Sequence, residues 1–363
     1  MSPRPLRSSE SGDRRASGRW STPTVALRGL FVLALVASLK AAQTLVFPLV
    51  LALLLSLLLR PPVRWLERLK LPSAVGALVV LLIGLAGLAL AFDRFQEPAM
   101  EWIGRAPRTI ERLERRVRDL RRPVEEVSAA AEEVQKMASG DDGRSAEVEI
   151  RKPSPAEMLV SKAPELVGGV VVTMVFLYLL LVFGPALSHR VIESFPRFRD
   201  RQRAETIFEG IGGKVSRYLL TITFINTCLG LVLGLVFQLL GLPSPWLWGA
   251  MAGLLNFVPY LGGFVGVFVV TLVSISTFGD PGKALLAPVL YAMINATEGL
   301  VITPIVLGNR FSLNPVVIFG WLLLWGWLWG VGGLLIAIPL LTIFKIFCEQ
   351  IPPLHWISRA LER

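Results

Sequence analysis

Long apolar runs separated by charged segments set the pattern of this sequence. The runs cover residues 25–59, 71–92, 166–183, 218–279, 284–307 and 311–344. Because about 20 consecutive apolar residues in a helix are enough to cross a bilayer, each run is a candidate membrane span. The pattern therefore predicts an all-α, polytopic membrane protein with about eight transmembrane helices, some of them broken or re-entrant, and an external helical insert.

The first apolar run, residues 25–59, is too long for one crossing. As a single helix it would be roughly 52 Å long, against a hydrocarbon core about 30 Å thick. Basic residues lie at both of its ends, with Arg28 near the start and Arg60 directly after it. Both ends can be cytoplasmic only if the chain crosses twice. We therefore expect a tight hairpin at residues 40–43.

Residues 245–263 interrupt the longest uncharged run. Asn256, Pro259 and Gly262 are poor helix formers, and membrane helices tolerate broken backbone only where protein or a water-filled cavity satisfies it. Residues 327–341 repeat Trp-Leu-Trp-Gly, Gly-Leu-Leu and a later proline in the same order. Paired interruptions indicate a transporter binding site, although glycines also serve close helix packing. We expect Asn256, Pro259 and Gly262 to line a solute path.

Glu298 is the one carboxylate inside these apolar runs. A charge at mid-bilayer costs roughly 2.5–3.5 kcal/mol on insertion scales, so its presence suggests a function or a buried partner. Asn295 lies about one turn away on the same helix face and could orient the carboxyl group. Both residues are candidates for the solute or ion path. A glutamate that only hydrogen-bonds to a neighbouring helix is the structural alternative.

Residues 93–165 differ from the spans because charges of both signs are dense there. Apolar residues recur there at the three- and four-residue spacing of a coiled coil or an amphipathic helix pair. They are Ile110, Leu113, Val117, Leu120, Val124, Val127, Ala131 and Val134. We predict an external helical insert that packs against a neighbouring helix or subunit and ends in a flexible loop at residues 138–155.

The charge of the connecting loops predicts the topology. Residues 185–217 hold seven lysines and arginines against four acidic residues, as expected of a cytoplasmic loop. Both termini are then cytoplasmic. The predicted segments are a disordered basic tail at 1–24, three spans at 25–92, the external insert at 93–165, a fourth span at 166–184, the cytoplasmic loop at 185–217, the broken-helix core at 218–347 and a tail at 348–363.

Composition supports the membrane assignment. Hydrophobic residues make up 53% of the 363 residues and charged residues 18%, below the roughly 25% of soluble domains. The basic residues behind the net charge of +10 mostly flank the apolar spans, so we expect no nucleic-acid partner.

Two isolated cysteines predict no disulfide framework. Residues 210–214 (GIGGK) lack the Ser/Thr and the preceding strand of a nucleotide loop. With no nucleophile–base pair or metal cluster visible, we predict no enzyme activity, metal or cofactor.

Motifs across residues 25–350 resemble the autoinducer-2 exporter (AI-2E) family of bacterial permeases. They are Arg60-Pro61-Pro62, Asn226, Gly241-Leu242-Pro243, residues 255–262 (LNFVPYLG), Glu298-Gly299 with Pro304, Gly308, Asn314-Pro315 and residues 330–339. The resemblance implies a multi-pass protein of the bacterial inner membrane, related to exporters of a small polar signalling molecule. It adds Asn226 to the candidate solute path. Other members of the family are linked to sodium/proton exchange.

Three functions remain open. The first is a secondary transporter that exports a small hydrophilic solute resembling autoinducer-2. The second is a sodium/proton antiporter, for which Glu298 would be the titratable group. The third is a non-transport scaffold whose insert at residues 93–165 binds an envelope partner. The expected partners are the lipid bilayer, a small polar solute or a cation, and further copies of the chain in a homo-oligomer of unspecified order.

Overall fold

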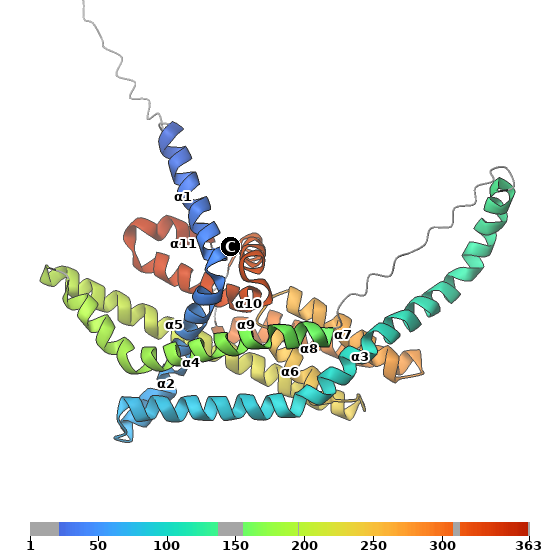
Figure 1. The fold of residues 1–363 in the computed structure, drawn as a ribbon, viewed down its shortest axis with the longest axis horizontal. Coiled ribbons are helices and arrows are strands. Elements are labelled where there is room, and N and C mark those ends of the chain that lie inside the picture. The colour runs from blue at the N-terminus through green and yellow to red at the C-terminus, as the bar shows by residue number, and fades with distance from the viewer. Residues whose placement is uncertain (1–21, 137–154, 195, 308–312, 362–363) are drawn as a thin grey trace, which may run out of the picture. The chain divides into compact units, whose positions relative to one another are not determined.

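The computed structural model describes residues 22–136, 155–194, 196–307 and 313–361, and these ranges form helices without a strand (Figure 1). The predicted all-α class is confirmed for this part of the chain. The protein divides into two compact units, residues 1–43 and 44–363.

In chain order the elements are α1 (Thr22–Ala41), α2 (Gln43–Arg68), α3 (Ser73–Lys136), α4 (Pro155–Glu193), α5 (Phe198–Leu239), α6 (Pro245–Leu255), α7 (Leu261–Thr277), α8 (Pro281–Thr297), the π-helical turn η1 (Glu298–Ile302), α9 (Thr303–Leu307), α10 (Pro315–Gln350), the 3₁₀ turn η3 (Pro352–Leu354) and α11 (His355–Leu361).

Six helical stretches in the described residues are long and apolar enough to cross a membrane. They are Gln43–Arg68, Ser73–Arg105, Val167–Glu193, Ala204–Leu239, Pro281–Leu307 and Pro315–Gln350. The described residues therefore contain fewer candidate spans than the roughly eight transmembrane helices predicted from the sequence. One reason is that α6 and α7 have only 11 and 17 residues, about 16 and 26 Å.

The first unit contains α1, which ends at Ala41, and α2 begins at Gln43. The helical segment from α1 to α2 is therefore interrupted at residue 42, inside the turn predicted at residues 40–43. The direction of α1 relative to α2, and with it the hairpin, stays a prediction. The predicted tail at residues 1–24 falls outside the described residues up to position 21.

The helices α2, α3 and α4 pack around one apolar cluster. Its buried members are Ala52 and Val63 of α2, Ala77 and Val80 of α3, and Leu177 and Leu181 of α4. The helix α3 continues through Asp93 to Lys136, so the change at residue 93 is one of composition along a single helix. The predicted seam starts at Ile110, where side chains are not described, and residues 138–154 of the predicted loop lie outside the described residues.

Four glycines bring α5 and α6 into backbone contact. Gly230 and Gly234 lie four residues apart on α5, and Gly249 and Gly253 have the same spacing on α6. A Cβ on Gly253 would lie 2.7 Å from the backbone oxygen of Asn226, and one on Gly230 would lie 2.8 Å from that of Gly249. Small residues four apart allow membrane helices to approach this closely. These pairings run α6 antiparallel along the second half of α5.

The helix breaks between α6 and α7, as the sequence predicts. Tyr260 has a φ of 63°, in the left-handed region that is costly for a residue with a Cβ. Gly262 lies against the backbone oxygen of Leu255, where a side chain would collide. The break therefore depends on a glycine at position 262.

The chain then turns back toward the end of α5. On α7, Gly263 lies against the side chain of Asn295 on α8, and Gly266 lies against the hydroxyl of Tyr291. Tyr291 stacks on Phe237 near the end of α5, with ring centroids 6.4 Å apart. The helices α6 and α7 therefore form a hairpin, here called the first hairpin, whose tip is residues 256–260.

The helix α10 also folds back on itself. Trp329 and Gly330 leave helical geometry, and Gly330 has a φ of 62°. The Nε1 of Trp321 donates to the backbone oxygen of Ala337 at 2.9 Å, although a straight helix would separate these positions by about 24 Å. The predicted interruption of this run is confirmed at Gly330. The two arms of α10 form a second hairpin.

The two hairpins approach from opposite ends of α5 and meet. The first hairpin follows the second half of α5, whereas Ile346 of α10 packs on Val215 and Leu219 in its first half. Val258 at the tip of the first hairpin is buried in one cluster with Leu322, Ala337 and Ile338 of α10. The tip of the first hairpin is therefore held by the arms of the second.

The sequence repeat does not become a repeat of structure. In the first copy the break follows α6 at Asn256, and Gly262 makes the close backbone contact. In the second copy the break falls at Gly330, where Gly333 contacts the backbone oxygen of Trp325, and Pro339 lies inside a helical arm. Both copies are therefore interrupted as predicted, but the glycine that permits each turn occupies a different place in the motif.

Candidate functional site

Polar side chains from α5, α8, η1 and the tip of the first hairpin meet in one hydrogen-bonded cluster. The Nδ2 of Asn256 donates to Oδ1 of Asn226 at 2.9 Å and to Oε2 of Glu298 at 3.2 Å. The Nδ2 of Asn295 donates to Oδ1 of Asn256 at 3.0 Å. Asn256 therefore joins three residues that lie 30 to 42 positions away in sequence.

Thr303, the first residue of α9 directly after the π-helical turn η1, is a fifth member. The hydroxyl of Thr303 donates to Oε1 of Glu298, and its backbone N–H donates to the backbone oxygen of Glu298. Positions five apart lie on different faces of an α-helix, whereas i→i+5 bonding brings them together, and such turns are frequent at functional sites. Pro304 follows and has no N–H to offer an α-helical ladder. We call Asn226, Asn256, Asn295, Glu298 and Thr303 the polar cluster.

The two ends of the polar cluster are buried. Glu298 is 6% exposed and Asn226 is 1% exposed. Each carboxylate oxygen of Glu298 accepts a hydrogen bond from a neutral donor, and it forms no ion pair with a residue in the described ranges. These bonds offset part of the cost of burying a carboxyl group.

One donor in the polar cluster is left over. The Nδ2 of Asn226 is buried and has no hydrogen-bond partner among the residues that the structure describes. A buried donor without a partner costs about 1–3 kcal/mol. A polar group brought to this position would recover that free energy. In the same ranges no group of three or more His, Cys, Asp or Glu side chains could hold a metal.

The structure brings four of the six predicted site residues together: Asn226, Asn256, Asn295 and Glu298. Pro259 and Gly262 lie in the hairpin tip and its exit, where they shape the backbone and offer no polar side chain. Sequence reasoning missed Thr303, because helical spacing places it on another face from Glu298. Pro304 was the available signal, since a residue without an N–H disturbs the ladder there.

The sequence comparison follows the same region. Residues 30–352 match the AI-2E family transporter family. The chain belongs to the AI-2E family of transporters. Its relatives include YhhT of Escherichia coli, 24% identical over 87% of each chain, and MT0215 of Mycobacterium tuberculosis, 28% identical over 91% of this chain and 89% of that protein. The AI-2 transport protein TqsA of Escherichia coli is 33% identical over 38% of this chain and 39% of its own.

In this AI-2E transporter the family match includes the whole polar cluster and both hairpins. It also includes α3 and α4 and the segment between them. The predicted family, and with it a multi-pass membrane transporter, is confirmed.

Proposed function

We propose that this AI-2E transporter exports a small hydrophilic solute, similar in kind to autoinducer-2, along a path that passes the polar cluster. The observation that carries the proposal is the convergence of Asn226, Asn256 and Glu298 at a hairpin tip inside the helix bundle. Broken backbone at membrane depth is tolerated where it is buried or lines a cavity, and transporter sites are built from discontinuous helices. The name of TqsA, an AI-2 transport protein, supports this solute class.

The proposal includes a topology in the bacterial inner membrane. The helices α1 to α5 and the α8–α9 stretch supply six crossings, an even number, and the two hairpins enter from opposite sides without crossing. Both termini are then cytoplasmic, and residues 93–165 are external. The sequence predicts about eight transmembrane helices with some of them broken or re-entrant, and this arrangement assigns six crossings and two re-entrant hairpins. The basic loop at residues 185–217 supports it.

The test is efflux of autoinducer-2 from proteoliposomes that contain the purified protein. Asn256→Ala removes the side chain that joins the polar cluster, and we expect slower efflux with protein yield and unfolding temperature close to wild type. Thr227→Val is the matched control, because Thr227 neighbours Asn226 on α5 but is exposed and bonds only to its own helix. If the unfolding temperature of Asn256→Ala falls together with its efflux rate, the role of Asn256 is structural. Absence of efflux with the wild-type protein would refute the proposal.

A second function, sodium/proton antiport, is favoured by one observation. Glu298 is a buried carboxyl group whose hydrogen-bond donors are all neutral, so protonation would break no ion pair with the described residues. The same proteoliposomes decide the matter when a sodium gradient is applied and the internal pH is followed. Proton movement in wild type that is lost in Glu298→Gln would establish antiport. Absence of both fluxes would favour a scaffold.

A further inference from the structure

A second polar region lies apart from the polar cluster, in a cavity of about 1250 Å³ between α2, α4 and α5. Its lining on α5 ends at Thr221, five residues before Asn226. Four arginines line it, namely Arg60, Arg64, Arg68 and Arg217, against one acidic residue, Glu205. A cavity with this charge balance favours an anion.

The arginines on α2 share one helix face. Arg60, Arg64 and Arg68 are spaced four apart, which places like charges beside one another. Arg64 and Arg217 are exposed, and the structure shows no ion pair from either to another described residue. Their guanidinium groups match the geometry of phosphate oxygens, which they can bind with two parallel hydrogen bonds.

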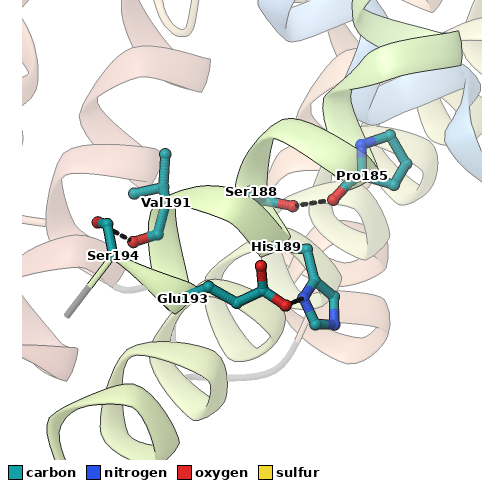
Figure 2. Close-up of polar contacts among 6 residues, drawn as sticks. All are labelled: Pro185, Ser188, His189, Val191, Glu193 and Ser194. Atoms are coloured by element: carbon teal, nitrogen blue, oxygen red, sulfur yellow. Dashed lines mark hydrogen bonds and ion pairs between the residues drawn. The ribbon is translucent and has the colours of Figure 1, made fainter. Parts of the chain in front are cut away.

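The polar residues that α4 contributes are already engaged within their own helix (Figure 2). His189 Nδ1 lies 3.4 Å from Oε1 of Glu193, and the Ser188 hydroxyl donates to the backbone oxygen of Pro185. The arginines of α2 and α5 are therefore the permanently cationic groups in the cavity lining.

Ser216 gives an independent sign of a ligand. It lines the cavity next to Arg217 and is 8% exposed. Its Oγ is buried and has no hydrogen-bond partner among the described residues. In a helix a serine hydroxyl usually bonds to the backbone one turn earlier, as Ser194 does with Val191. An anion in the cavity would accept the hydrogen bond that Ser216 does not make within the protein.

The apolar part of the lining narrows the class of ligand. Trp65 and Phe208 line the cavity and are 61% and 47% exposed. Large exposed apolar side chains beside arginines suit a molecule with a charged head and an apolar tail. Basic pockets between membrane helices on the cytoplasmic side bind anionic lipid headgroups. We propose that this cavity binds the phosphate group of an anionic phospholipid, with Arg64, Arg217 and Ser216 as its ligands.

The experiment measures the unfolding temperature of the full-length protein in an uncharged detergent. One arm adds phosphatidylglycerol, a second adds phosphatidylcholine, and a third adds inorganic phosphate at constant ionic strength. Phosphatidylglycerol should raise the unfolding temperature, with smaller effects in the other arms. Two variants test the ligands: the double variant Arg64→Gln/Arg217→Gln loses charge-assisted bonds to phosphate, and Ser216→Ala loses a hydrogen bond to it. Each should need about tenfold or more phosphatidylglycerol for the same shift in unfolding temperature.

The control is Arg190→Gln, which removes the same charge from the end of α4 outside the cavity lining. It should respond like wild type. Because Arg64 and Arg217 are exposed, the double variant should fold, and its unfolding temperature without lipid checks this. The lipid bound after purification, measured as phosphorus per protein, should fall only in the cavity variants. Equal responses in the double variant and the control would overturn the site, and a response to inorganic phosphate alone would overturn the assignment to lipid.

Discussion

The side-chain nitrogen of Asn256 lies 3.2 Å from a carboxylate oxygen of Glu298, although 42 positions separate the two residues in sequence. The contact joins the tip of the first hairpin to the π-helical turn after α8. The same nitrogen also donates to Asn226 on α5. A change at either end of this contact therefore reaches three parts of the bundle.

Glu298→Gln separates a titrating role from a structural one. Glutamine keeps the shape and one acceptor oxygen, and its amide group can donate to the hydroxyl of Thr303, so we expect an unfolding temperature close to wild type. If Glu298 exchanges a proton, the variant loses the pH dependence of efflux from proteoliposomes. Thr297→Ala is the control, since Thr297 is exposed and bonds only to Met293 of its own helix. Normal pH-dependent efflux in Glu298→Gln would make the glutamate structural.

Gly263→Ala should disturb the polar cluster without changing any of its side chains. The added Cβ would lie 2.6 Å from Oδ1 of Asn295, and overpacking of this kind costs about 1–3 kcal/mol. Asn295 must shift, which disturbs its hydrogen bond to Asn256, so we expect slower efflux and a lower unfolding temperature. Gly320→Ala is the control, because nothing lies within 4 Å of its added Cβ. If both variants transport equally well, the position of Asn295 does not matter for transport.

The fold-back of α10 predicts a cross-link. A Cβ on Gly326 would lie 2.9 Å from the side chain of Leu334. Cysteines at these two positions, with Cys228 and Cys348 replaced by alanine, should form a disulfide under mild oxidation. Alkylation of any free thiols followed by mass spectrometry detects whether the disulfide has formed. In a continuous helix the two positions would lie about 12 Å apart, beyond the roughly 7 Å that a disulfide can bridge. Free thiols after oxidation would therefore contradict the hairpin.

The topology can be tested with a membrane-impermeant maleimide on intact cells. A cysteine at Ser139, within the predicted external insert, should be modified from outside. A cysteine at Ser194, exposed at the end of α4 (Figure 2), should react only after the membrane is opened. The reverse pattern would invert the proposed topology. Both cysteine variants require a background without Cys228 and Cys348.

The apolar and polar pattern of the chain was enough to predict most of the apolar helices, the break after α6 and four members of the polar cluster. These follow from rules that act locally along the chain. Lipid excludes charges and unpaired backbone groups, so uncharged runs must be helices, and Asn256 and Glu298 stand out as costly residues within them. Four of the predicted site residues meet in the structure for this reason.

How these elements meet follows from packing that the local pattern does not specify. The chain turns back after Asn256 and after Trp329, where Gly262 and Gly333 make close contacts with the backbone oxygens of Leu255 and Trp325. Thr303 joined the cluster through a π-helical turn, and the cavity arises where α2 and α5 bring their arginines together. These outcomes rest on contacts across turns and between helices, which the spacing of residues along one straight helix does not encode.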